Sequence, residues 1–240
     1  MIQAVNSLQI TEENMTYKKR MILAGVLSAM FLLLLILVKT VDVAPIGPSG
    51  TEIGLATING AVHEGIGIHL GWYRLTEVFG ILAILTAGGG ALIGLLQWIT
   101  RKSLFKVDAE ILTAGLLFIV TILLYALFEK AVINYRPIIM PGDTEPEASF
   151  PSSHTFLIIV VMGGVFILSS KYTPDGLIQT GIQVLCAAVI LLTVIGRLVS
   201  GVHWISDIIA GVLLGATLLA WFRVGLRWIK RLLKKAQKEA

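Results

Sequence analysis

The segment GRLVSGVHWISD, residues 196–207, places Arg197, His203 and Asp207 within eleven positions. His203 and Asp207 are four positions apart, so on a helix they share a face. A carboxylate beside an imidazole fixes the tautomer of the ring and supports its charged form, which prepares the histidine for nucleophilic attack. An arginine adds a planar fork that matches the oxygens of a phosphate. The segment therefore indicates phosphate chemistry with His203 as the nucleophile.

Two further segments carry side chains suited to the same chemistry. FPSSHT, residues 150–155, is predicted to open a helix, whose free backbone N–H groups and dipole favour an anion. His154 in this segment is placed to protonate a leaving oxygen. KAVINYRP, residues 130–137, adds the guanidinium of Arg136. Two arginines and a helix N-terminus together suit a phosphate of roughly double charge.

The composition indicates an integral membrane protein. Of the 240 residues, 56% are hydrophobic and 14% are charged, and the mean hydropathy is +0.86. A soluble domain carries about a quarter charged residues. The lone cysteine, Cys186, excludes an internal disulfide. There is no soluble domain or internal repeat, so we expect residues 1–240 to form a single membrane domain.

Six apolar runs are candidates for transmembrane helices: residues 21–38, 78–99, 111–128, 156–169, 177–196 and 205–222. Eighteen residues at roughly 1.5 Å each nearly cross a hydrocarbon core of roughly 30 Å. The fourth run reaches this length if it begins near Ser152. We therefore predict an all-α polytopic membrane protein with six spans and both termini on one side.

The basic residues indicate which side that is. Fourteen of the 19 lysines and arginines lie on the side of the termini: Lys18, Lys19, Arg20, Arg101, Lys102, Lys106, Lys171, Arg223, Arg227, Lys230, Arg231, Lys234, Lys235 and Lys238. Short loops rich in Lys and Arg are cytoplasmic. We therefore predict a cytoplasmic N-terminal segment, residues 1–20, and a cytoplasmic basic tail, residues 223–240, which anchors on anionic lipid or binds a partner. The three segments described above then lie at the outer face.

The outer loop, residues 40–72, contains a capping-box pattern at residues 49–52 ahead of the modestly apolar residues 53–62. We expect a short interfacial helix there, between the first and second spans. His63 and His69 follow it. Without a third ligand these two are interpreted as solvated or interfacial histidines rather than a metal site, and no metal site is predicted.

The three chemically active segments resemble the signatures of the type-2 phosphatidic acid phosphatase family of membrane lipid phosphatases. The family patterns K-x6-R-P, P-S-G-H and S-R-x5-H-x3-D correspond here to KAVINYRP, PSSH and GRLVSGVHWISD. The order of the segments, their predicted outward placement and the six spans are also similar. By motif the resemblance covers roughly residues 111–222, and the third signature is the specific one.

The resemblance implies a role for each matching residue. It implies a phosphate-binding set: Arg136, Arg197 and Ser152. His154 is then the general acid, and His203 is the nucleophile that forms a phosphohistidine, oriented by Asp207. The resemblance implies that no metal or other cofactor takes part.

Three departures from the family patterns affect the predicted site. Gly196 replaces a serine, and Ser153 replaces a glycine, which adds a side chain beside the phosphate. Lys130 lies six positions before Arg136 instead of seven, and Glu129 stands at the expected place. One position is a turn of about 100° on a helix. We expect Lys130 to swing in on its flexible stem to the phosphate, and the alternative is that it is an interfacial anchor.

Together these observations predict an enzyme that hydrolyses a phosphomonoester or diphosphate on a lipid at the outer leaflet of the cell membrane. The substrate class implied by the resemblance is undecaprenyl diphosphate, phosphatidylglycerophosphate, phosphatidic acid or diacylglycerol diphosphate, the first being favoured for a bacterial chain. The alternative is a non-catalytic lipid-phosphate binding or transport protein on the same scaffold. A channel or secondary transporter would need ionisable residues at mid-membrane depth, and the predicted spans lack them. The expected partners are the lipid substrate and the bilayer, with no nucleic acid, and the oligomeric state stays open.

Overall fold

The computed structural model describes residues 2–239, which form helices and two isolated β-bridges. The α-helices are α1 (Ile2–Thr40), α2 (Ala56–Ile66), α3 (Leu70–Arg101), α4 (Ala109–Lys130), α5 (Ser153–Tyr172), α6 (Gly176–Val199) and α7 (Ile205–Glu239). Two short 3-10 helices, η1 (Pro48–Gly50) and η2 (Leu104–Lys106), lie between them. Six of the α-helices are long and apolar enough to cross a membrane. The predicted all-α architecture with six spans is confirmed.

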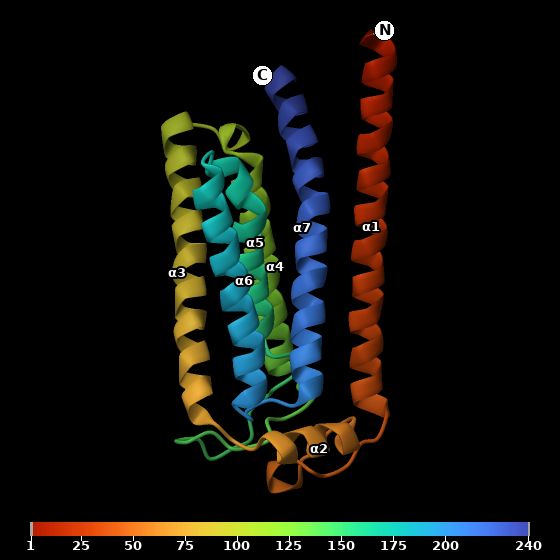
Figure 1. The fold of residues 1–240 in the computed structure, drawn as a ribbon, viewed down its shortest axis with the longest axis vertical. Helices are drawn as coiled ribbons and strands as arrows, with labels where there is room; N and C mark the ends of the chain where they lie inside the picture. Colours follow the sequence, from red (N-terminus) through yellow and green to blue (C-terminus); the bar gives the residue numbers. More distant parts are fainter. Residues whose placement is uncertain (1, 240) are drawn as a thin grey trace.

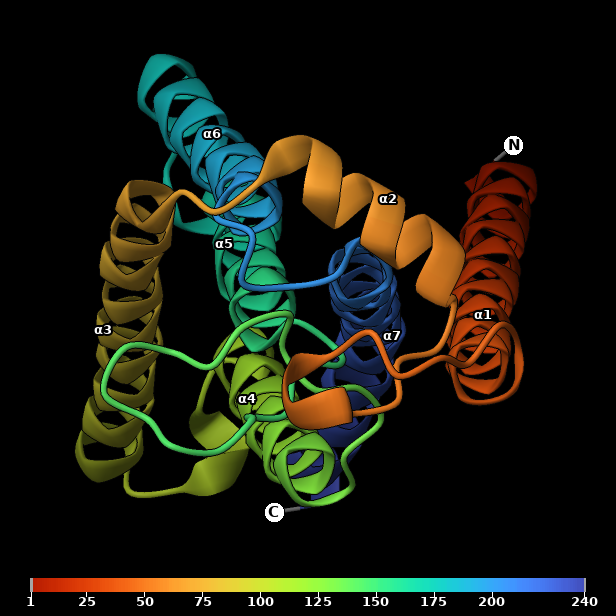
Figure 2. The same ribbon diagram turned by 90° about the horizontal axis from the view of Figure 1, so that it is seen from below.

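The six long helices run side by side, and both ends of the chain lie at the same end of the bundle, here called the terminus end (Figure 1). At the opposite end, the site end, α2 lies across the bundle together with the loops of residues 131–152 and 200–204 (Figure 1). Seen from the site end, α2 extends from α1 past α7 toward α6 (Figure 2). The predicted short helix between the first two spans is therefore present.

The packing order places α5 in the middle of the bundle. It packs against α3, α4, α6 and α7, whereas α1 packs mainly against α7. Phe156 and Val160 of α5 are buried, while Leu85 of α3 and Leu123 of α4 are 65% and 63% exposed. Large apolar side chains in such numbers on an outer surface fit contact with acyl chains. The central helix is thus the one whose first residues carry the PSSH segment.

Glycines bring α7 directly onto the start of α5. A Cβ added at Gly211 would lie 2.8 Å from Cβ of Thr155 and 2.9 Å from the carbonyl oxygen of Ser152. A Cβ at Gly215, one turn further on, would lie 2.7 Å from Ile159. Small residues allow membrane helices to approach this closely. The contact holds the first turns of α5 and α7 together at the site end.

Two helix starts differ from the predicted ones. The predicted capping box at residues 49–52 is wrong: Ser49 lies in η1 with a positive φ of 57°, and α2 begins at Ala56. The N–H of Thr57 in the first turn of α2 instead donates to Oδ2 of Asp42, at 2.7 Å. A side chain fifteen residues upstream therefore caps the helix. α3 begins at Leu70, eight residues before the predicted start of the second span.

The polar segments at the two ends of the chain are helical continuations of the first and last spans. α1 runs through most of the predicted N-terminal segment, and α7 runs through the basic tail as far as Glu239. Residues 1 and 240 of those two segments lie outside the described range.

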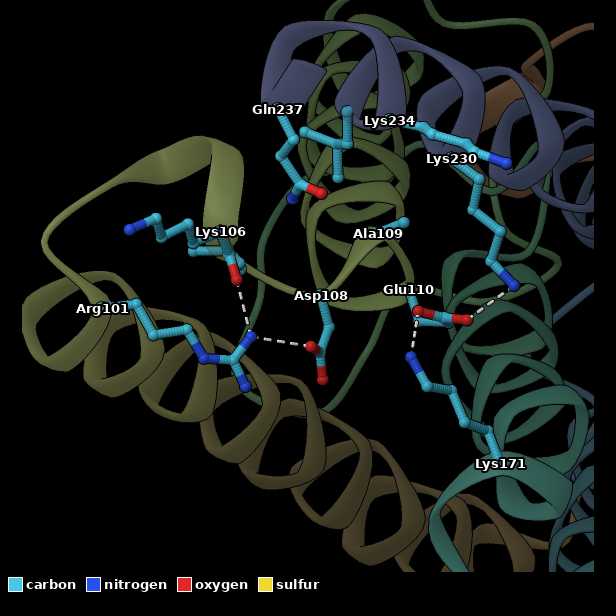
Figure 3. Close-up of a pocket in the computed structure, with 11 residues that line it drawn as sticks. Arg101, Lys106, Asp108, Ala109, Glu110, Lys171, Lys230, Lys234 and Gln237 are labelled. Carbon is cyan, nitrogen blue, oxygen red and sulfur yellow. Dashed lines mark hydrogen bonds and ion pairs between the residues drawn. The ribbon is translucent and has the colours of Figure 1, made fainter. Parts of the chain in front are cut away.

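A cavity of about 700 Å³ opens at the terminus end, between the ends of α3, α4, α5 and α7 (Figure 3). In it, Glu110 of α4 bonds to Lys171 of α5 and, at 2.8 Å, to Lys230 of α7. Asp108 accepts a hydrogen bond of 2.8 Å from Arg101. None of the predicted site residues lines this cavity, and its ion pairs tie four helix ends together.

Candidate active site

The pair of His203 and Asp207 lies where the loop after α6 enters α7. Nδ1 of His203 is 3.6 Å from Oδ2 of Asp207, and the two side chains are 2% and 0% exposed. The same carboxylate oxygen accepts the backbone N–H of Trp204, at 3.0 Å. Because the Nδ1 edge of the ring faces the carboxylate, Nε2 is the nitrogen available to attack.

Three other elements hold the start of α7 in place. Asn59 of α2, fully buried, donates to Oγ of Ser206 at 2.9 Å and accepts the backbone N–H of Ser206 at 3.1 Å. Nε1 of Trp204 donates to the carbonyl oxygen of Tyr135, at 2.7 Å. The carbonyl oxygen of Asp207 accepts the N–H of Ser152 at the start of α5, at 3.0 Å. The crossing helix α2 therefore serves to fix the histidine–aspartate pair.

Burial lowers the pKa of His203 well below its ordinary value of 6.5. Positive charge on Arg136, Arg197 and His154 lowers this pKa further. At neutral pH the imidazole is consequently uncharged and its Nε2 lone pair is available. This is the form a nucleophilic histidine needs.

Arg197, in the last turn of α6, has no exposed surface. Its Nη2 donates to Oε1 of Glu77 at 2.5 Å, and its Cζ lies 4.8 Å from the centre of the Tyr73 ring. Its Nε and Nη1 are buried and have no hydrogen-bond partner among residues 2–239. Unpartnered buried donors on a cation are costly, so this edge of the guanidinium suits an anionic ligand.

Arg136 is held by a short antiparallel pairing within the loop of residues 131–152. Its backbone N–H donates to the carbonyl oxygen of Glu147 at 2.9 Å, and the N–H of Ser149 donates to that of Asn134 at the same distance. The side chain is 14% exposed, and its Nε lies 2.9 Å from Oε2 of Glu147. The loop thus delivers the second predicted arginine to the neighbourhood of His203.

The PSSH segment opens α5, as predicted. Ser152 is the residue before the helix and is fully buried, and its Oγ accepts from Oγ1 of Thr155 at 2.9 Å. Ser153 is the first helical residue. His154 follows, 23% exposed, with Nε2 at 3.2 Å from Oε1 of Glu77. The helix N-terminus and the predicted acid therefore lie on the same side as His203.

Some sequence candidates lie away from these groups. Lys130 is the last residue of α4, and both Lys130 and Glu129 are exposed; neither forms a hydrogen bond or ion pair with the predicted site residues within the described chain. The ring of His63 packs 5.4 Å from that of Trp204, and His69 is the residue before α3, with its Nε2 3.0 Å from the carbonyl oxygen of Ile66. Within residues 2–239, Lys130 and the two outer-loop histidines thus form no hydrogen bond or ion pair with the predicted phosphate-binding residues.

The sequence reasoning missed the contribution of α3. Tyr73 and Glu77 contact Arg197 or His154, but the second span was predicted to begin just after them. A signal was present, because Tyr73, Glu77 and Gly80 are spaced i, i+4 and i+7 and so line one helix face. Glu147, the partner of Arg136, carries no comparable pattern.

The fold and this geometry define a polytopic helical membrane protein in which a buried histidine–aspartate pair lies beside two arginines and a helix N-terminus. A family model described as the PAP2 superfamily matches residues 110–231, which is more than half of the chain. The chain belongs to the PAP2 superfamily, as the motifs predicted, and this membership supports phosphatase activity.

A solved structure has the same fold. It is described as the first transmembrane PAP2 type phosphatidylglycerolphosphate phosphatase from Bacillus subtilis. The two chains are 21% identical, with a TM-score of 0.56, and the match covers 84% of this chain and 94% of that one. No curated protein gives a significant match. The structural likeness therefore supports the six-span fold.

Proposed function

We propose that the chain removes phosphate from a membrane lipid phosphomonoester or diphosphate through a phosphohistidine intermediate on His203. The observation that carries the proposal is the buried His203, which lies 3.6 Å from Asp207, in a chain whose fully buried Arg197 leaves Nε and Nη1 without partners among residues 2–239. Binding an anion alone would not need a nucleophile with an orienting carboxylate. Membership of the PAP2 superfamily supports the same activity.

The first step transfers the phosphoryl group to the protein. Arg136, Arg197 and the N-terminus of α5 at Ser152 and Ser153 bind the phosphate oxygens. Nε2 of His203 then attacks phosphorus, and the bond from phosphorus to the ester oxygen of a monoester, or to the bridging oxygen of a diphosphate, breaks. His154 donates a proton to that leaving oxygen.

The second step regenerates the enzyme. Water attacks the phosphohistidine, the P–N bond breaks, and His154 accepts the proton that water loses. Inorganic phosphate leaves, and His203 returns to its neutral form. The lipid product is an alcohol from a monoester, or a lipid monophosphate from a diphosphate. No step in this scheme is assigned to a metal or cofactor.

The decisive experiment measures phosphate release by the purified chain from undecaprenyl diphosphate, phosphatidylglycerophosphate, phosphatidic acid and diacylglycerol diphosphate. Wild type should turn over at least one of them and yield an acid-labile phosphoenzyme on quenching. His203→Ala should lose both signals. His154→Ala should lose most activity on lipids but keep more on an activated aryl phosphate, whose leaving group needs little protonation. Phosphoenzyme in His203→Ala would overturn the assignment of the nucleophile.

The alternative, a lipid-phosphate binding or transport protein, makes the opposite forecast. Wild type would then bind these lipids without releasing phosphate, and His203→Ala would bind them as well as wild type. The exposed Lys130, which departs in spacing from the family pattern, is the observation that favours this alternative.

The proposed site faces the outer leaflet, because fourteen of the 19 basic residues belong to the side of the termini. With Cys186 replaced by alanine, a single cysteine at Asp143, an exposed residue of the loop of residues 131–152, should react with an impermeant thiol reagent in intact cells. A cysteine at Lys102 should resist it. The reverse labelling pattern would place the site in the cytoplasm.

A further inference from the structure

Glu77 of α3 contacts two of the predicted site residues, Arg197 and His154. Its Oε1 lies 2.5 Å from Nη2 of Arg197, at the end of α6, and 3.2 Å from Nε2 of His154, at the start of α5. One carboxylate oxygen thus connects the predicted phosphate ligand to the predicted acid across three helices. The motifs and the family resemblance assign Glu77 no part.

The face of α3 around Glu77 is built against the same two side chains. One turn before it, the ring of Tyr73 stacks 4.8 Å from Cζ of Arg197. One turn after it stands Gly80, where an added Cβ would lie 2.8 Å from Cδ2 of His154. Because any larger residue at Gly80 would displace the imidazole, the packing fixes the distance between α3 and His154.

The contact leaves the rest of the arginine available for a ligand. A guanidinium has five N–H donors in a rigid fork, and Glu77 accepts from Nη2 alone. Nε and Nη1 of Arg197 stay buried without a hydrogen-bond partner within residues 2–239. Glu77 therefore holds one edge of the guanidinium and presents the other.

We propose that Glu77 is a positioning residue, which sets the orientation of the Arg197 fork and of the His154 ring before the phosphate arrives. A carboxylate bonded to one imidazole nitrogen fixes the ring plane and decides which nitrogen carries a proton. This role rests on the proposed phosphatase function. It also differs from that of a displaced counter-ion, because Glu77 stays bonded while phosphate binds the other edge of Arg197.

The test compares Glu77→Gln and Glu77→Asp with wild type, and uses Glu129→Gln as the matched control. Glu129 is exposed near the same end of the bundle, at the end of α4, and within residues 2–239 it forms no hydrogen bond or ion pair with the site residues described above. We expect Glu77→Gln to lower kcat/KM on the lipid substrate by roughly 10- to 100-fold. Glu77→Asp, which keeps the charge, should recover part of the loss, and Glu129→Gln should stay within about twofold of wild type.

Two readouts separate positioning from a merely structural role. The Glu77→Gln defect should be larger on the lipid than on an activated aryl phosphate, because part of it acts through His154. A structural defect would lower both rates equally, reduce the folded fraction and not be rescued by aspartate. A Glu77→Gln variant with tighter substrate binding would identify Glu77 as a competitor of phosphate. Each of these results, or activity within twofold of wild type, overturns the proposal.

A binding measurement keeps this proposal separate from the proposed function. Inorganic orthophosphate should raise the unfolding temperature of wild type, since a ligand that binds the folded state stabilises it, and should raise it less in Glu77→Gln than in Glu129→Gln. Wild type that releases no phosphate from any lipid would refute the phosphatase proposal. In that case the orthophosphate comparison decides the role of Glu77, and equal shifts in the two variants overturn it.

Discussion

Both ends of the bundle gather acidic and basic side chains where helices meet, but they pair them differently. At the terminus end, Glu110 binds Lys171 and Lys230, and Arg101 binds Asp108 (Figure 3). The three basic side chains there are 40–53% exposed, so water shares in solvating them. Glu110, whose side chain is 4% exposed, has two cationic partners.

At the site end, the cations are the buried members. Arg197 has no exposed surface, and two of its nitrogens have no hydrogen-bond partner in the described chain. An exposed ion pair contributes little to stability, whereas a buried charge without full pairing carries a large desolvation cost. The charged cluster at the terminus end therefore connects helices to one another. The cluster at the site end has unpartnered donors that a bound phosphate would satisfy.

The largest effect is expected at the buried arginine. Arg197→Lys keeps the charge but removes the fork that can bind two oxygens, so kcat/KM should fall by roughly 10- to 100-fold. Arg101→Lys at the terminus end should leave kcat/KM within about twofold. Steady-state phosphate release in the same detergent measures both. Equal defects in the two variants would erase the functional distinction between the ends.

At Glu110 we expect a loss of stability without a loss of activity. Glu110→Gln leaves Lys171 and Lys230 without their carboxylate, and since both lysines are about half exposed the loss in unfolding free energy should be about 1–3 kcal/mol. Denaturant titration in micelles measures it, with Glu129→Gln as the control. Activity per folded molecule should not change. A selective loss of kcat/KM at full stability would show that the terminus-end cluster takes part in catalysis.

Acidification should distinguish His203 from an exposed histidine. The pKa of His203 is lower in the folded chain than the 6.5 expected in the unfolded chain. At a pH between the folded and unfolded pKa values, the unfolded chain therefore takes up a proton and the folded chain does not. The stability contributed by this group is therefore complete above pH 6.5 and is lost as the pH falls toward the folded pKa. Imidazole NMR signals, assigned with His203→Gln, should titrate with a midpoint below 6.5. A midpoint at or above 6.5 would contradict the neutral nucleophile.

The smallest effect is expected at Lys130. Its exposure at the end of α4 supports the interfacial-anchor alternative, so Lys130→Ala should keep kcat/KM within about twofold of wild type. If Lys130 instead swings in to bind phosphate, loss of a charge-assisted hydrogen bond should lower kcat/KM by roughly 10- to 150-fold. Measured beside Arg197→Lys, the variant decides whether the site-end cluster extends to α4.

The parts of the site that sequence could predict are those encoded by local patterns. Hydropathy identified the six spans, and the helix start at Ser153 followed from PSSH standing before an apolar run. The topology then required the segments around Arg136, His154 and Arg197 to meet at one end, although about sixty residues separate the first from the last.

The parts that sequence could not predict depend on contacts between distant segments. The predicted local capping box does not cap α2. The side chain of Asp42, from an earlier part of the loop, instead accepts a hydrogen bond from the first turn of the helix. Glu77 was not predicted from the sequence because hydropathy marks where a helix becomes apolar and not where it begins. α3 begins at Leu70 and runs through polar residues, of which Thr76 is buried, before its apolar stretch. The first two turns of α3 are positioned by contacts with Arg197 and His154, which no local sequence pattern encodes.

The packing of α1 on α7 has a consequence for assembly. Nε1 of Trp221 donates to Oγ of Ser28 at 3.1 Å, and Arg227 stacks on the ring of Tyr17 at 4.8 Å. Because the main packing partner of α1 is α7, we expect α1 to lack this contact until nearly the whole chain has been synthesised. Residues of the proposed site at the start of α7 enter the membrane in the same final stage. We therefore expect the bundle to close and the His203–Asp207 pair to form at the same stage of folding.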